Sequence, residues 1–307
     1  MQNIILYCTT FMIFGTTWFA IKYQLGIVAT ELAVGYRFAL ASLLIFAWCL
    51  IKGKNLRFSF KNHCYFALQG CLLFSINLLF FYYATHHVVS AINGIVFSTI
   101  IIFNILLSYF IYNTPITKEI AIGAFLGLSG LGAIFWPQLS ALEFNGSTII
   151  GLGLGLMGTL FASCGQMISA RNQKQDIPVM ENNAYGMAYG ALLCFALALI
   201  TGKEFNFDWS VSYVSSLLYL SIMGSIVAFG CYLTLLGRIG AGKAAYSSLL
   251  TSIIALAIST VFEGFEWTTN AIIGVTLTLL GNVVILMRKK VAPVPVVEGV
   301  TELKKAA

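Results

Sequence analysis

Ten apolar windows, each long enough to cross a bilayer as a helix, constrain the fold of this chain more than any other feature. A spanning helix needs about 20 apolar residues, so roughly 200 of the 307 residues would lie in lipid. Only 9% of the residues are charged, against about 25% in soluble domains. The sequence therefore predicts an all-α integral membrane protein of ten transmembrane helices, and it excludes a soluble globular protein.

The predicted spans fall into two groups of five. The first group lies near residues 3–21, 31–51, 64–83, 88–112 and 117–136. The second lies near residues 148–169, 181–201, 213–236, 244–262 and 269–287. The connections are too short for a separate catalytic or ligand-binding domain. We expect one unit over residues 1–137, a second over 138–290, and a disordered cytoplasmic tail over 291–307, which combines two prolines with small and charged residues.

Lysine and arginine in the connections predict the orientation, because translocation of positive charge is disfavoured. Only Lys22 and Lys203 lie on one side. The other side holds Lys52, Lys54, Arg57, Lys61, Lys118, Arg171, Lys174, Arg238, Lys243, Arg288, Lys289, Lys290, Lys304 and Lys305. We therefore expect a multi-pass protein of the cytoplasmic (inner) membrane, with both termini cytoplasmic.

Other partners and chemistries find little support in the sequence. The basic residues are spread over short loops rather than gathered with aromatics in a patch, which argues against nucleic acid as a partner. The 7 cysteines are scattered and lack metal-ligand spacing, so we expect no disulfide framework, metal or other cofactor. No metalloprotease motif, paired midspan carboxylates or Ser/His pair indicates an intramembrane enzyme. The expected partners are a small-molecule substrate and membrane lipid.

An internal repeat relates two segments about 150 positions apart. The first contains Tyr82, Ser90, Ala91, Asn113, Gly123 and Gly130. The second contains Tyr232, Gly240, Ala241, Glu263, Gly274 and Gly281. Five spans per unit is an odd number, so the second unit must enter the membrane from the opposite side. Inverted repeats are typical of secondary transporters, which bind substrate near the midplane and rock around it.

The chain resembles the drug/metabolite transporter superfamily, specifically its ten-helix class with two EamA-type repeats. Phe14-Gly15-Thr16-Thr17-Trp18, Tyr36-Arg37-Phe38, the run from Gly237 to Ala245, and the spacing from Glu263 to Gly281 carry the resemblance. It implies that spans one, three, four, six, eight and nine surround a central cavity. The chain departs from the family where prolines are common in spans four and nine, since it has Ile102 and Ser252 there.

Polar residues inside the spans are candidates for the substrate pathway, because a polar group in hydrocarbon is costly unless it is paired or hydrated. Asn93, Phe97 and Asn104 share one helical face, as do Thr159, Ser163 and Gln166. The full candidate set is Thr16, Trp18, Asn77, Phe81, Tyr82, Asn93, Phe97, Ser163, Gln166, Tyr232, Tyr246 and Thr251. The alternative is that these side chains only join neighbouring helices.

Arg37 is the basic residue that lies well inside a predicted span. A structural interpretation has it reach the membrane interface or pair with Glu31 or Glu263. The alternative is that it binds a carboxylate of the substrate. Both interpretations stay open at the level of sequence.

The sequence thus predicts a secondary transporter or exporter of small organic metabolites, with amino acids or related amphipathic compounds as the expected class and alternating access as the mechanism. An adenosyl metabolite such as S-adenosylmethionine is an alternative substrate, because aromatic faces bind both an adenine ring and a sulfonium. A non-transporting membrane sensor or scaffold is the alternative function. The acidic residues of the spans lie near span ends, which favours facilitated diffusion or exchange over proton coupling.

Overall fold

The computed structural model describes residues 2–24, 26–88, 90–140, 142, 145–262 and 267–286. The predicted tail and Glu263 lie outside the described residues, and so does the side chain of Trp18. The described chain is almost entirely helical. The apolar windows become helices because a chain in lipid must satisfy its backbone hydrogen bonds internally.

Five helical segments form the first half, some of them built from more than one element. These elements are α1 (Gln2–Ile21) with η1 (Lys22–Gln24), α2 (Thr30–Ile51), α3 (Phe60–Cys71) with η2 (Leu72–Ile76) and α4 (Asn77–Thr85), α5 (Ser90–Ser98) with α6 (Ile100–Tyr112), and α7 (Lys118–Ile134). A short helix, α8 (Trp136–Ser140), follows and leads towards the second half.

The second half repeats this organisation. Its elements are α9 (Gly146–Gln173), α10 (Val179–Ile200), α11 (Val211–Tyr219) with η3 (Leu220–Ala228) and α12 (Phe229–Ile239), α13 (Ala241–Ala244) with α14 (Ser247–Phe262), and α15 (Thr269–Leu286). The third segment of each half contains π-helical turns, in η2 and in η3. The two halves therefore share an irregularity as well as an order of helices.

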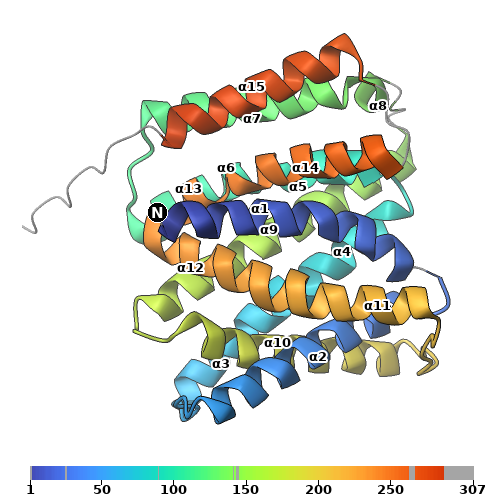
Figure 1. The fold of residues 1–307 in the computed structure, drawn as a ribbon, viewed down its shortest axis with the longest axis vertical. Helices are drawn as coiled ribbons and strands as arrows, with labels where there is room; N and C mark the ends of the chain where they lie inside the picture. The colour runs from blue at the N-terminus through green and yellow to red at the C-terminus, as the bar shows by residue number, and fades with distance from the viewer. Residues whose placement is uncertain are drawn as a thin grey trace, which may run out of the picture.

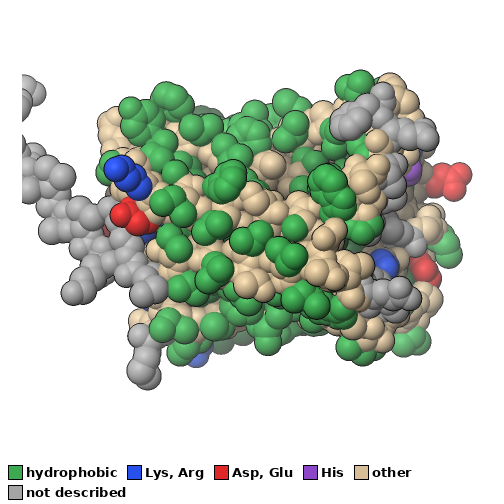
Figure 2. All heavy atoms as spheres, turned by 90° about the horizontal axis from the view of Figure 1, so that it is seen from above, with side chains coloured by type: hydrophobic (Ala, Val, Ile, Leu, Met, Phe, Trp, Pro, Cys, Tyr) green, Lys and Arg blue, Asp and Glu red, His purple; other side chains and the backbone are tan. Residues whose placement is uncertain are grey.

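An apolar belt surrounds the helices. Eight helical segments of the described chain are long and apolar enough to cross a membrane, and the shorter α7 and α15 have 17 and 18 residues. Figure 2 shows hydrophobic side chains across the middle of one face, with lysine, arginine, aspartate, glutamate and histidine towards the two ends. This distribution is that of a membrane-spanning protein, and it confirms the predicted fold class.

The packing of α7 on α15 reveals how the halves are related. A Cβ atom on Gly123 would lie 2.9 Å from the carbonyl oxygen of Gly281, and one on Gly281 would lie 2.8 Å from that of Gly123. Gly130 and Gly274 approach each other in the same reciprocal way. Because Gly123 corresponds to Gly274 and Gly130 to Gly281 in the repeat, these contacts exchange with each other under a twofold rotation. The two halves are thus an inverted repeat.

The helices lie in layers, roughly along one direction (Figure 1). The pair α7 and α15 forms one edge of the array, and α2, α3 and α10 lie at the other. Between them, α9 packs against α4, α5 and α6, while α1 packs against α12 and α14. We call the end of the helical bundle at which α1 begins the N-terminal end of the bundle.

Spans four and nine are discontinuous although neither contains a proline at the family's position. The helix of span four is interrupted at Thr99, whose hydroxyl donates to the carbonyl of Val96 (2.6 Å). In span nine the interruption lies at 245–246, and the hydroxyl of Ser247 donates to Ala244 (2.8 Å). Serine and threonine hydroxyls that bond the preceding turn bend helices. Hydroxyl side chains therefore accompany both breaks.

Candidate functional site

Helix α9 is the element on which the candidate residues converge. Its first turn is capped by Asn145, whose side chain accepts a hydrogen bond from the backbone N–H of Thr148 (2.9 Å). Further along, Gly155, Thr159, Ser163 and Gln166 are buried, at intervals of three to four residues. This spacing places them on one helical face. The face meets α4, α5 and α6, so the predicted polar stripe of span six does point into the protein.

A first group of candidates combines two carboxamides with two aromatic rings; we call it the amide–aromatic group, and it consists of Asn77, Phe81, Asn93 and Phe97. The rings of Phe81 and Phe97 meet edge to face, with centroids 5.5 Å apart. Asn77 and Asn93 are 5% and 2% exposed. The Oδ1 atom of Asn77, and both polar atoms of the Asn93 side chain, lack a hydrogen-bond partner among the described residues.

Glycines of α9 border the amide–aromatic group. A Cβ atom on Gly155 would lie 3.6 Å from Oδ1 of Asn93, and one on Gly158 would lie 3.1 Å from the ring of Phe81. Small residues at these positions let α9 approach α4 and α5 closely. Unpaired buried amides are costly, and a native protein that keeps them commonly uses them for a ligand or for water. The group thus offers free hydrogen-bonding atoms between aromatic faces.

A second group is joined by internal hydrogen bonds; we call it the Gln166 network. The Oε1 atom of Gln166 accepts from Asn104 Nδ2 (2.7 Å) and from the hydroxyl of Tyr232 (2.7 Å). The hydroxyl of Ser163 donates to Asn104 Oδ1 (2.5 Å). These four side chains come from α6, α9 and α12. They hold three spans together in the half of the bundle towards the N-terminal end.

Sequence reasoning missed a third polar group, which lies near the last turns of α3 and α9 and the first turn of α10. Asn182 Nδ2 donates to Gln69 Oε1 (2.9 Å), and Asn172 Nδ2 donates to Asn182 Oδ1 (2.9 Å). All three side chains are fully buried. The neighbouring Asn183 is also buried, and its amide lacks a partner among the described residues. The signal was present, because these amides occur in or beside apolar windows, where burial of a polar group is costly.

The structure gives Arg37 and Glu31 separate partners. Arg37, which is 8% exposed, donates from Nε to the hydroxyl of Ser225 (2.9 Å). Glu31, which is 3% exposed, accepts a hydrogen bond from the hydroxyl of Tyr83 (2.6 Å). Glu263 lies outside the described residues. Arg37 is therefore held inside the protein by a hydrogen bond to η3.

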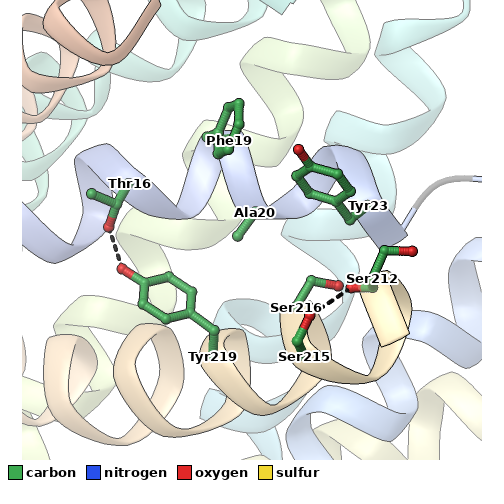
Figure 3. Close-up of a pocket in the computed structure, with 8 residues that line it drawn as sticks. All are labelled: Thr16, Phe19, Ala20, Tyr23, Ser212, Ser215, Ser216 and Tyr219. Atoms are coloured by element: carbon green, nitrogen blue, oxygen red, sulfur yellow. Dashed lines mark hydrogen bonds between the residues drawn. The ribbon is translucent and has the colours of Figure 1, made fainter. Parts of the chain in front are cut away.

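The remaining candidates are distributed around these groups. Thr16 contacts Tyr219 through a hydrogen bond between the two hydroxyls at a cleft between α1 and α11, and the cleft has a volume of about 520 Å³ (Figure 3). The lining residues of this cleft are Thr16, Phe19, Ala20, Tyr23, Ser212, Ser215, Ser216 and Tyr219. Tyr82 lies on α4, directly after Phe81.

The candidates of span nine are bound to backbone atoms. The hydroxyl of Tyr246 donates to the carbonyl of Ile120 in α7 (2.6 Å). The hydroxyl of Thr251 donates to Ser247 within α14 (3.0 Å). Tyr246 thus joins the break in span nine to α7, within a hydrophobic cluster that contains neither Phe81 nor Phe97. Both hydroxyls are therefore engaged with backbone carbonyls of α7 and of span nine.

The candidate side chains offer hydrogen bonds and aromatic surfaces. Within the described chain, no three side chains of His, Cys, Asp or Glu lie close enough to hold a metal ion. The groups available are carboxamides, hydroxyls, aromatic rings and one guanidinium. Such a set suits a small organic molecule with polar and apolar parts, which is held by hydrogen bonds and aromatic contacts.

Comparisons with known proteins assign the chain to a group of transporters. The sequence model of the EamA-like transporter family matches residues 1–136 and 149–287. The uncharacterized transporter YoaV of Bacillus subtilis is 24% identical over 284 residues, which are 91% of this chain and 96% of that protein. The uncharacterized inner membrane transporter YedA of Escherichia coli is 25% identical over 295 residues, which are 92% of each.

A solved crystal structure has the same fold. It superposes with a TM-score of 0.77 at 18% sequence identity, and the match covers 92% of this chain and 95% of the other. At this identity the likeness concerns the fold alone.

Proposed function

The chain belongs to the EamA-like transporter family, and from this premise we propose that it is a secondary transporter of small organic metabolites, namely amino acids or related amphipathic compounds. The observation that supports this most strongly is the amide–aromatic group. Its free amide atoms suit the polar part of such a molecule, and the rings of Phe81 and Phe97 suit its apolar part. No element of the proposal requires ATP or a cofactor.

Alternating access is the proposed mechanism, and the Gln166 network is its candidate gate. The network joins α6, α9 and α12 towards the N-terminal end of the bundle. Opening a path at this end would require its hydrogen bonds to separate and be replaced by water. Each bond contributes only about 0.5–1.5 kcal/mol net, so such a gate can open at moderate cost. The inverted repeat supplies the rocking symmetry that this mechanism uses.

We propose facilitated diffusion or exchange rather than proton coupling. Every acidic residue of the described chain lies in the first turn of a helix or in a connection; these residues are Glu31, Glu119, Asp176, Glu181, Glu204 and Asp208. A proton relay needs titratable groups at membrane depth. Flux should therefore persist when nigericin dissipates a pH gradient, and a flux that collapses with the pH gradient would overturn this part of the proposal.

A counterflow assay tests the proposed function. Purified protein is reconstituted into liposomes that are preloaded with one unlabelled solute, and uptake of the same labelled solute is followed for L-amino acids, S-adenosylmethionine and glucose. We expect saturable uptake of an amino acid, lost in Asn93→Ala because the free amide is removed. Phe125→Ala is the control, because Phe125 is 72% exposed on the outside of α7 and should leave the flux unchanged.

The outcomes separate the candidate functions. Saturable amino-acid flux that depends on Asn93 supports the proposal. Flux of S-adenosylmethionine alone would mean that the substrate is an adenosyl metabolite and not an amino acid. Correctly folded protein that carries none of these solutes would overturn the proposal and favour a membrane sensor or scaffold.

A further inference from the structure

Arg37 carries a positive charge where one is costly. It lies seven residues after Thr30, where α2 begins, which is about 10 Å along the helix axis. Its side chain is 8% exposed. A buried charge costs several kcal/mol unless another charge or several hydrogen bonds compensate it. The role of Arg37 therefore depends on which groups compensate its charge.

The described partners leave most of the guanidinium without an acceptor. Nε donates to the hydroxyl of Ser225, which is neutral. A guanidinium has five N–H donors, and this hydrogen bond uses one of them. The ring of Phe38 lies 5.2 Å from Cζ and adds a cation–π contact. None of these contacts neutralises the charge.

No carboxylate of the described chain lies within ion-pair distance of Arg37. Glu31, which precedes it on α2, accepts its hydrogen bond from Tyr83 instead. A buried arginine in a membrane span commonly faces a partner charge or a water-filled path. The geometry at Arg37 thus calls for an anion that is not one of the described side chains.

The terminal nitrogens of Arg37 lie against a glycine of η3. A Cβ atom on Gly224 would lie 3.2 Å from Nη2 of Arg37 and 3.0 Å from Cγ2 of Thr17. A glycine at this position therefore keeps a side chain from crowding the terminal nitrogens. Gly224 and Ser225 both lie in the π-helical turns of η3, and π-helical turns are frequent at functional sites.

Arg37 is also adjacent to the proposed pathway. Helix α2, which carries Arg37, packs against α4, which carries Asn77 and Phe81 of the amide–aromatic group. Gly224 and Ser225 of η3 lie beside Arg37, and Thr17 of α1 lies close to the same glycine, so spans one and eight border Arg37.

We propose that the guanidinium of Arg37 binds a carboxylate of the transported molecule, so that the substrate class is restricted to organic acids and zwitterions. The planar guanidinium can present two parallel N–H groups to a carboxylate, which gives geometric selectivity as well as attraction. The amide–aromatic group then holds the rest of the molecule. This inference rests on the proposed transport function and names the chemistry of its substrate.

The test compares carboxylates with their amides in the counterflow assay. For each solute that the wild type carries, the unlabelled acid and its carboxamide compete for uptake; L-phenylalanine and L-phenylalaninamide are one such pair. We expect the amide to compete at least about tenfold more weakly, which corresponds to about 1.4 kcal/mol. Arg37→Gln should raise the half-saturation concentration of the acid by a similar factor and abolish the discrimination, whereas Arg37→Lys should retain part of it.

Two further arms distinguish binding from a structural role. Phenylglyoxal modification of Arg37 in the wild type, mapped by mass spectrometry, should be slowed by the acid and not by the amide. Glu263→Gln removes the carboxylate that is the alternative partner of Arg37. The acid should still compete for uptake more strongly than its carboxamide, by the same factor as in the wild type. Equal protection by both compounds, an unreactive Arg37, or a Glu263→Gln variant that loses discrimination would each overturn the inference.

The outcomes also separate this inference from the proposed function. A wild-type protein that carries only solutes without a carboxylate is a transporter to which the inference does not apply, so the inference falls and the transport function stands. Absence of flux for every solute overturns the proposed function, and the inference falls with it.

Discussion

Individual polar residues in this protein fall into two energetic classes that look alike in the sequence. Asn93 and Gln166 are both amides in apolar windows, and both lie on the buried face of their helix. Gln166 accepts two hydrogen bonds, whereas the amide of Asn93 has none among the described residues. A paired amide stabilises the fold, and an unpaired one destabilises it while remaining available to a ligand.

Leucine substitutions should therefore shift stability in opposite directions at these two residues. Asn93→Leu removes an unsatisfied buried amide and should raise the free energy of unfolding by about 1–3 kcal/mol while it abolishes transport. Gln166→Leu removes the oxygen that accepts hydrogen bonds from Asn104 and Tyr232. It should lower the free energy of unfolding by about 1–3 kcal/mol for each of these two groups that loses its partner. Thermal unfolding in detergent measures both. A destabilised Asn93→Leu variant would mean that this amide has a structural partner.

At the scale of elements, glycines determine which helices approach closely. Gly130 of α7 lies against Gly274 of α15, where an added Cβ atom would meet the partner's backbone. Gly132, two residues later on the same helix, faces open space. The sequence shows both residues in an apolar window, and only the packing of α15 separates them.

Alanine substitutions at these two glycines form a matched test. Gly130→Ala should force α7 and α15 apart and cost about 1–3 kcal/mol, the usual penalty for overpacking. Gly132→Ala should be neutral or should stabilise the helix by up to about 1 kcal/mol, because alanine loses less conformational entropy than glycine. The midpoint of thermal unfolding would report the difference. Equal effects at both positions would contradict the close contact between the two helices.

The whole molecule is organised by an inverted repeat whose halves exchange under a twofold rotation. The reciprocal contacts of Gly123 with Gly281, and of Gly130 with Gly274, lie across this rotation axis. The π-helical turns of η2 and η3 also occupy the same segment of each half. The proposed alternating access would use this symmetry, with two related conformations formed by exchanging the roles of the halves.

The orientation of the molecule in the membrane is testable through its two ends. The excess of lysine and arginine at the N-terminal end predicts that this end is cytoplasmic. In a variant with Cys8 and Cys64 replaced by serine, we expect Lys203→Cys to react with an impermeant maleimide in intact cells. Lys54→Cys should react only after the membrane is opened. The reverse pattern would contradict the predicted orientation.

The sequence by itself determined the number of spans, the inverted repeat and the polar stripes of spans four and six. These follow from helix periodicity and from the requirement that a backbone in lipid bond to itself. Only the tertiary structure decided that Asn104 and Gln166 bond to each other and that Arg37 reaches Ser225. It also decided that amide atoms of Asn77 and Asn93 have no hydrogen-bond partner among the described residues. It also revealed the buried Gln69, which pairs with an amide on another helix. The reason is physical: periodicity fixes the face on which a side chain lies, but its partner depends on the helix packed opposite, which is remote in sequence.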